Sequence, residues 1–131
     1  MAVVPSDFGA ALTADVIQGQ LQNEIQVLAA DGAITIKSGK VIITKGSAAA
    51  ITLAAPTAGL LAAGGDDGKE LEVYSTTAFA HTVTISGGLA GAGASADVAT
   101  YGAAAANRMR LFAYNGAWYL SGGAVVGVTF A

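Results

Sequence analysis

The chain has 131 residues, of which 53% are hydrophobic and 11% charged, with a formal net charge of −3 at pH 7 and no cysteine. The lack of cysteine excludes disulfides, thiolate metal sites and thiol catalysis. The six basic residues form no cluster, so we expect no binding to nucleic acid or to an anionic membrane surface. Charged residues make up about a quarter of an average domain. So apolar a chain is expected to share its surface with other protein, as an oligomer or docked on a larger body.

Residues 1–30 differ in pattern from the rest. Their apolar side chains recur at intervals of three to five: Phe8, Leu12, Val16, Leu21, Ile25 and Leu28. The spacing predicts two short amphipathic helices interrupted near Gly19. Either they cover one end of the domain's own core, or they form an arm that reaches a neighbouring subunit. The segment lacks the charge and apolar run of a signal peptide, and no apolar run of the chain is long enough to span a membrane.

The pattern changes to a period of two from residue 33 onward. Alternation and turn signals predict short strands at 33–37, 40–45, 51–53, 70–75, 81–86, 98–101, 109–114, 117–120 and 125–130. Short strands at this spacing are typical of an all-β sandwich or barrel. We therefore divide the chain into an N-terminal arm, 1–30, and a β-sandwich domain, 31–131.

Two tight turns predict hairpins. Ser38-Gly39 would pair Ile36 with Val41 and Ile34 with Ile43. Asn115-Gly116 is the strongest hairpin signal of the chain. The pairs expected across it are Ala113 with Trp118, Leu111 with Leu120, and Phe112 with Tyr119. Both faces of this second hairpin are then apolar or aromatic, so it lies at the centre of a sandwich or offers one face to another subunit.

Residues with catalytic chemistry are few. His81 is the only histidine, it is in phase with Val83 and Ile85, and we interpret it as a histidine at the edge of the core, satisfied by a local hydrogen bond. Asp66 and Asp67 are adjacent rather than alternating, which favours a turn over a calcium loop. No constellation of a nucleophile, base and acid is marked. We expect no catalytic residue, no metal and no cofactor, and a hydrolase is the least favoured interpretation.

Two segments carry a resemblance to a known family. They are "AAITLAAPTAGLLAAGGDDGKELEVYSTTAFAHTVTI" and "NRMRLFAYNGAWYLSGG", which together span roughly residues 48–121. Their strand ending at Pro56, their paired strands and their late aromatic hairpin resemble the head decoration (capsid cement) proteins of tailed phages, and also head- or tail-fibre domains.

This resemblance implies a β-sandwich or jelly-roll domain that forms a homotrimer on the outer surface of a virion, made in the host cytoplasm, where it binds the major capsid protein and stabilises the shell. It brings no catalytic residues. Our candidates for the capsid contact are Phe8, Leu12, Val16 and Leu21, and for the trimer interface Phe112 and Tyr119. The alternative is a fibre domain that binds a receptor or carbohydrate, which exposed Trp118 or Tyr101 would support.

Overall fold

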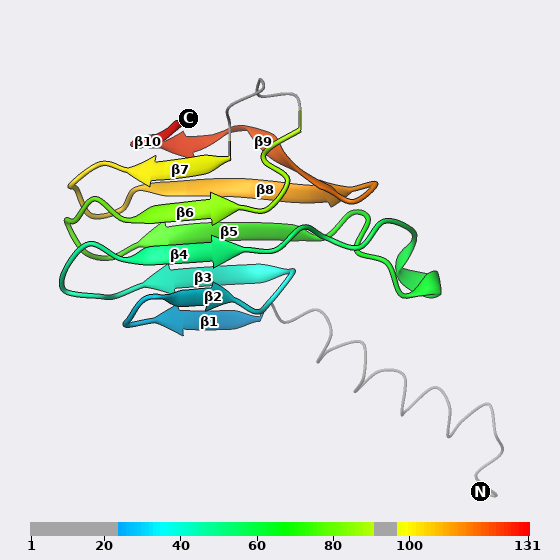
Figure 1. Cartoon of the computed structure of the whole chain (residues 1–131), viewed down its shortest axis with the longest axis horizontal. Coiled ribbons are helices and arrows are strands. Elements are labelled where there is room, and N and C mark those ends of the chain that lie inside the picture. The colour runs from blue at the N-terminus through cyan, green and yellow to red at the C-terminus, as the bar shows by residue number, and fades with distance from the viewer. Residues whose placement is uncertain (1–23, 91–96) are drawn as a thin grey trace, which may run out of the picture.

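The protein is an all-β sandwich of two five-stranded sheets (Figure 1), seen in a computed structural model that describes residues 24–90 and 97–131. Sheet A has the order β1-β3-β5-β8-β9, and sheet B the order β10-β7-β6-β4-β2. The elements are β1 (Ile25–Leu28), β2 (Gly32–Ile34), β3 (Gly39–Ile43), β4 (Ala50–Leu53), the 3-10 helix η1 (Leu61–Ala63), β5 (Glu70–Ser75), β6 (Thr82–Ile85), β7 (Val98–Tyr101), β8 (Arg108–Tyr114), β9 (Ala117–Val126) and β10 (Val128–Phe130).

The first six strands alternate between the sheets. Strands β1, β3 and β5 are parallel neighbours in sheet A, and β2, β4 and β6 are parallel neighbours in sheet B. Each pair of consecutive strands is therefore one coil around the core, and three coils stack as in a short solenoid. The remaining strands pair antiparallel, and β9 passes through Gly127 into β10, so that the chain crosses from sheet A to sheet B. The sandwich is as expected, but a jelly roll would lack this parallel pairing.

The hairpin predicted at Ser38-Gly39 is wrong. β2 lies in sheet B and β3 in sheet A, so Ile34 and Ile43 are not cross-strand partners. Both are buried nonetheless, as is Val41, and Ile36 packs against the same core. Two strands that face each other across a core show the same alternation as two strands side by side, and only the pairing of their backbones distinguishes them.

The helix predicted through Ile25 and Leu28 is also wrong over those residues. Residues Ile25–Leu28 are strand β1, which pairs parallel with β3 and directs Ile25 and Val27 outward, 67% and 59% exposed. β3 supplies the hydrogen bonds that a helix would have formed internally, and tertiary pairing outweighs the weak helical spacing. The Gln26 side chain donates to the Ala33 carbonyl (3.0 Å) and accepts from the Thr35 amide (2.8 Å), which joins the two sheets at this end.

The core lies between the sheets and is built from their inward rows. Trp118 and Tyr101 are its largest fully buried side chains. The Trp118 indole donates to the Ala54 carbonyl (2.9 Å), and the Tyr101 hydroxyl donates to the Val73 carbonyl (2.7 Å). Over the described residues, no buried side-chain nitrogen or oxygen lacks a hydrogen-bond partner. The buried polar side-chain atoms of the described residues are therefore all paired, as stable interiors require.

Candidate interaction surface

The hairpin predicted at Asn115-Gly116 is confirmed, and it creates an aromatic patch on the outer face of sheet A. Phe112 pairs with Tyr119 across β8 and β9, and their rings stack with centroids 5.2 Å apart and planes 10° apart. Tyr114, 56% exposed, lies 6.2 Å from the Tyr119 ring. We call Phe112, Tyr114 and Tyr119 the aromatic patch. Aromatic side chains are enriched at the centres of protein interfaces, where they bury a large area at a small cost in conformational entropy.

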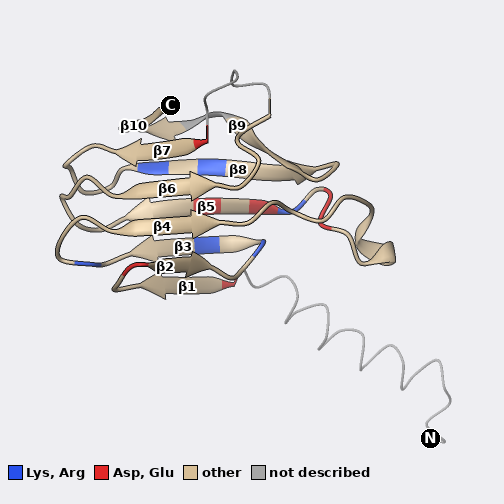
Figure 2. Cartoon of the chain, viewed as in Figure 1, with Lys and Arg blue, Asp and Glu red and all other residues tan. Residues whose placement is uncertain are grey.

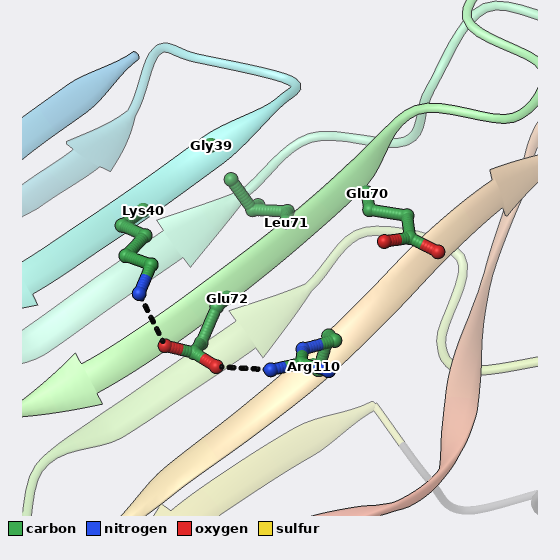
Figure 3. Close-up of a pocket in the computed structure, with 6 residues that line it drawn as sticks. All are labelled: Gly39, Lys40, Glu70, Leu71, Glu72 and Arg110. Atoms are coloured by element: carbon green, nitrogen blue, oxygen red, sulfur yellow. Dashed lines mark hydrogen bonds and ion pairs between the residues drawn. The ribbon is translucent and has the colours of Figure 1, made fainter. Parts of the chain in front are cut away.

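A charged row crosses the same face. Lys40, Glu72 and Arg110 are register partners on β3, β5 and β8. Glu72 lies between the two cations, 3.6 Å from Lys40 Nζ and 3.0 Å from Arg110 Nη2 (Figure 3). Its side chain is 11% exposed, against 50% for each cation. With Gly39, Glu70 and Leu71 these side chains line a shallow hollow of about 270 Å³. The sequence alone does not reveal that Lys40 and Arg110 are the partners of Glu72, because these residues come from three separate strands.

The two outer faces differ in charge (Figure 2). Strands β3, β5 and β8, the middle of sheet A, carry Lys40, Glu70, Glu72, Arg108 and Arg110. None of the five strands of sheet B contains a charged residue. Outward threonines occupy that face instead: Thr52, Thr82, Thr84, Thr100 and Thr129. The molecule therefore has one charged, aromatic face and one neutral face.

His81 is fully buried and has a structural environment, as expected. The Ala49 amide donates to His81 Nδ1 (3.0 Å), so Nε2 carries the proton of the neutral ring and donates to Thr77 Oγ1 (2.9 Å). The Thr77 hydroxyl in turn donates to the Lys45 carbonyl (2.9 Å). Burial lowers the pKa of His81, an interaction with the Thr77 backbone opposes this, and the charge of Lys45 lowers the pKa further. The imidazole is thus held neutral, with both nitrogens in use.

Asp66 and Asp67 belong to a turn, also as expected. The Asp66 carboxylate accepts from Lys69 Nζ (2.8 Å) and from the Thr57 amide (2.8 Å), and these two bonds, Lys69 first, lower its pKa. Asp67 Oδ1 accepts from the Gly59 amide (3.2 Å) and the Asn115 amide (2.8 Å). Both carboxylates are engaged with the protein itself, which fits an anchor for a loop.

The described part of the chain holds no group of three or more His, Cys, Asp or Glu side chains placed to bind a metal. Within those same residues, no helix has the length and apolar character needed to cross a membrane. Trp118 and Tyr101, the two side chains that could have stacked on a sugar, are fully buried, so the support they would have lent to a carbohydrate-binding fibre domain is absent.

The candidate contact residues fall into two groups. Phe112 and Tyr119 lie together on one surface, whereas Phe8, Leu12, Val16 and Leu21 lie outside the described residues. No protein-family model, curated protein or solved structure matches the chain. The resemblance to phage decoration proteins therefore stays a prediction that rests on the residues quoted for it.

Proposed function

We propose that the protein is a structural component of a virion: a capsid decoration protein that forms a homotrimer, binds the major capsid protein on the outer surface of a phage head and stabilises the shell. It acts through its surfaces and not as an enzyme. The observation that carries this proposal is the aromatic patch, which stands partly exposed on a rigid sheet with a charged row beside it.

Three further features support a role in packing. The core is a continuous apolar cluster whose buried polar side-chain atoms all have partners over the described residues, so the sandwich offers a body on which an interface can be built. Among the described residues, the aromatic side chains that stand outside the core are those of the aromatic patch and the partly exposed Phe79 and Tyr74. The neutral face of sheet B allows a second close contact without charge repulsion between copies that each carry a net charge of −3.

The capsid contact is assigned in this proposal to the segment before β1, with Phe8, Leu12, Val16 and Leu21 as apolar anchors. These side chains would bury on the capsid the apolar surface that a short segment cannot bury on itself. The trimer interface is assigned to Phe112 and Tyr119.

Two measurements test the proposed function. Native mass spectrometry of the free protein is expected to give three times the mass of the chain. Quantitative mass analysis of purified virions is expected to find hundreds of copies per particle, because a decoration protein repeats over the whole shell. A handful of copies would identify a fibre component, and absence from the particle would contradict a virion role altogether.

A further inference from the structure

The segment between β4 and β5 projects beyond the ends of both sheets, as the green loop at the right of Figure 1 shows. It contains η1, and its tip carries two adjacent leucines: Leu60 is 71% exposed and Leu61 is 59% exposed. We call residues 56–65 the knob. These are among the most exposed large apolar side chains of the described chain, and such exposure commonly marks a contact site.

The knob is held in one conformation by its own backbone. The Gly65 amide donates to the Leu60 carbonyl (2.9 Å), the Asp66 amide to Thr57 (2.8 Å) and the Asp67 amide to Gly59 (3.0 Å). Gly65 packs so closely on the Gly59 carbonyl that a Cβ at this position would collide with it. The apolar tip is therefore ordered before any partner arrives, which lowers the entropy cost of binding.

The base of the knob is fixed to the sandwich. Asp67 accepts from the Asn115 amide at the turn between β8 and β9, and the Gly68 amide donates to the Ala113 carbonyl (2.8 Å). The buried Trp118 holds the Ala54 carbonyl, two residues before the knob begins. The tip is thus coupled rigidly to the core and to the hairpin that carries the aromatic patch.

An apolar hollow of about 400 Å³ lies at the same end of the molecule, on the neutral face of sheet B. Its lining comes from the ends of β2, β4 and β6 and the residues after them: Ala33, Ile34, Thr52, Leu53, Ala54, Thr84 and Ser86. The high exposure of Leu60 and Leu61 means that the knob does not fill the hollow of its own chain. No charged residue occurs anywhere from position 46 to 65, so the knob itself has no charge to bury. At the end of β4, Lys37 Nζ donates to the Ala54 and Ala55 carbonyls (3.3 and 3.2 Å), which places one paired ammonium beside the hollow.

We propose that Leu60 and Leu61 of one copy insert into the hollow on sheet B of a second copy. The inference rests on the homo-oligomer of the proposed function and adds a second contact between copies to the one assigned to Phe112 and Tyr119. Knob and hollow are different patches, so the contact is heterologous, and such contacts close into rings when the rotation permits. A cyclic trimer has one such contact at each of its three seams. A lipid bilayer is the less favoured occupant, because the chain carries a net charge of −3, which anionic headgroups repel.

The test uses two variants of the full chain. Leu60→Ser with Leu61→Ser removes the apolar side chains at the tip of the knob. Ala33→Trp places a large side chain in the hollow, and residue 33 is exposed, so the substitution does not disturb the core. Each is expected to leave the unfolding temperature of the sandwich nearly unchanged and to raise the dissociation constant of the oligomer at least about 100-fold, since two leucine side chains lose their apolar burial. Thr129→Ser, on the same sheet but outside the hollow, is the matched control and is expected to assemble like the wild type.

A mixture gives the decisive result. The knob variant keeps an intact hollow and the hollow variant keeps an intact knob, so an equimolar mixture is expected to form heterodimers by native mass spectrometry while each variant alone is monomeric. If both variants assemble like the wild type, the knob contact is refuted and the proposed oligomer stands. If the wild type itself is monomeric up to high concentration, both proposals fail. Flotation with phosphatidylcholine vesicles that depends on Leu60 and Leu61 would assign the knob to a membrane instead.

Discussion

Two aromatic side chains at the centre of the sandwich use their polar atoms to hold backbone carbonyls of other segments. Tyr101 in sheet B reaches Val73 in sheet A, and Trp118 in sheet A reaches Ala54 beyond the end of β4 in sheet B. Each of these hydrogen bonds therefore connects the two sheets, which the backbone hydrogen bonds within a sheet cannot do. Burial also raises the pKa of Tyr101 far above its usual value, so its hydroxyl keeps its proton and remains a donor at neutral pH.

We expect Tyr101→Phe to lower the free energy of unfolding by about 1–3 kcal/mol, because the Val73 carbonyl loses its donor in a place that water cannot reach. Urea denaturation at pH 7.5 measures the change. Tyr114→Phe is the matched control, since Tyr114 is 56% exposed. Equal effects of the two substitutions would contradict a structural role for the Tyr101 hydroxyl.

His81 predicts a pH dependence of stability. Its pKa is lowered in the folded protein, first by burial, so the unfolded chain binds more protons below about pH 6.5. The stability it contributes is present above that pH and is lost as the pH falls toward the folded pKa. We expect the urea midpoint to decrease from pH 8 to pH 5 in the wild type and to stay flat in His81→Asn. The carboxylates of Asp31 and Asp66, whose pKa values are also lowered, respond only below about pH 4. A midpoint that is unchanged across this range in the wild type would refute the assignment.

At the scale of elements, the passage from β9 to β10 closes one end of the sandwich. Gly127 lies at this passage with a φ of +65°, and an added Cβ there would collide with the Asn107 carboxamide. That carboxamide donates to the Gly102 carbonyl (2.8 Å), and the Gly102 amide donates to the Gly127 carbonyl (2.8 Å). These hydrogen bonds join the crossing to the loop between β7 and β8. Position 127 requires glycine because its φ is positive and because a Cβ there would collide with Asn107.

Gly127→Ala is expected to cost at least about 2 kcal/mol in the free energy of unfolding, through backbone strain and displacement of Asn107. Thermal and urea denaturation measure it. Gly46→Ala is the control, because nothing lies within 4 Å of a Cβ built there, and we expect a change within about 0.5 kcal/mol. Similar losses for the two variants would show that the crossing is not the cause.

For the whole molecule, the central property is the difference between its two outer faces. Sheet A carries the charged row beside the aromatic patch, and sheet B carries threonines without a charge. A homo-oligomer that buries the neutral face and the patch can keep the charges of sheet A in water, where ion pairs contribute little to stability but maintain solubility.

Phe112→Ser combined with Tyr119→Ser tests the part that the patch has in assembly. Both side chains stand on the outer face, so we expect the fold to persist and the dissociation constant of the oligomer to rise at least about tenfold. Sedimentation velocity over a concentration series measures it, with circular dichroism to confirm folding. Thr82→Ser with Thr129→Ser on the opposite face is the control. An oligomer that survives the aromatic double substitution unchanged would remove Phe112 and Tyr119 from the interface.

Local alternation and turn chemistry determined much of this protein by themselves. Strands β5 and β7 and the hairpin around Asn115-Gly116 follow from residues close together in sequence, because a period of two and an Asn-Gly turn act over a few residues. The placement of His81 in phase with the core and the role of Asp66 as a turn residue follow for the same reason, whereas the hydrogen bond to His81 comes from the Ala49 amide, just before β4. The pairing of Phe112 with Tyr119 is a direct consequence of that one turn.

Only the tertiary structure decided how the strands are shared between the sheets. Alternation records that one side of a strand is buried but not which strand lies next to it, so β2 and β3 show the pattern of a hairpin although they face each other across the core. Residues 25–28 form strand β1 because they pair with the edge of β3. The charged row of Lys40, Glu72 and Arg110 joins residues far apart in the chain. The parallel pairing of β3 with β5 and the antiparallel pairing of β5 with β8 bring them together. The hollow on sheet B likewise forms only when β2, β4 and β6 lie side by side.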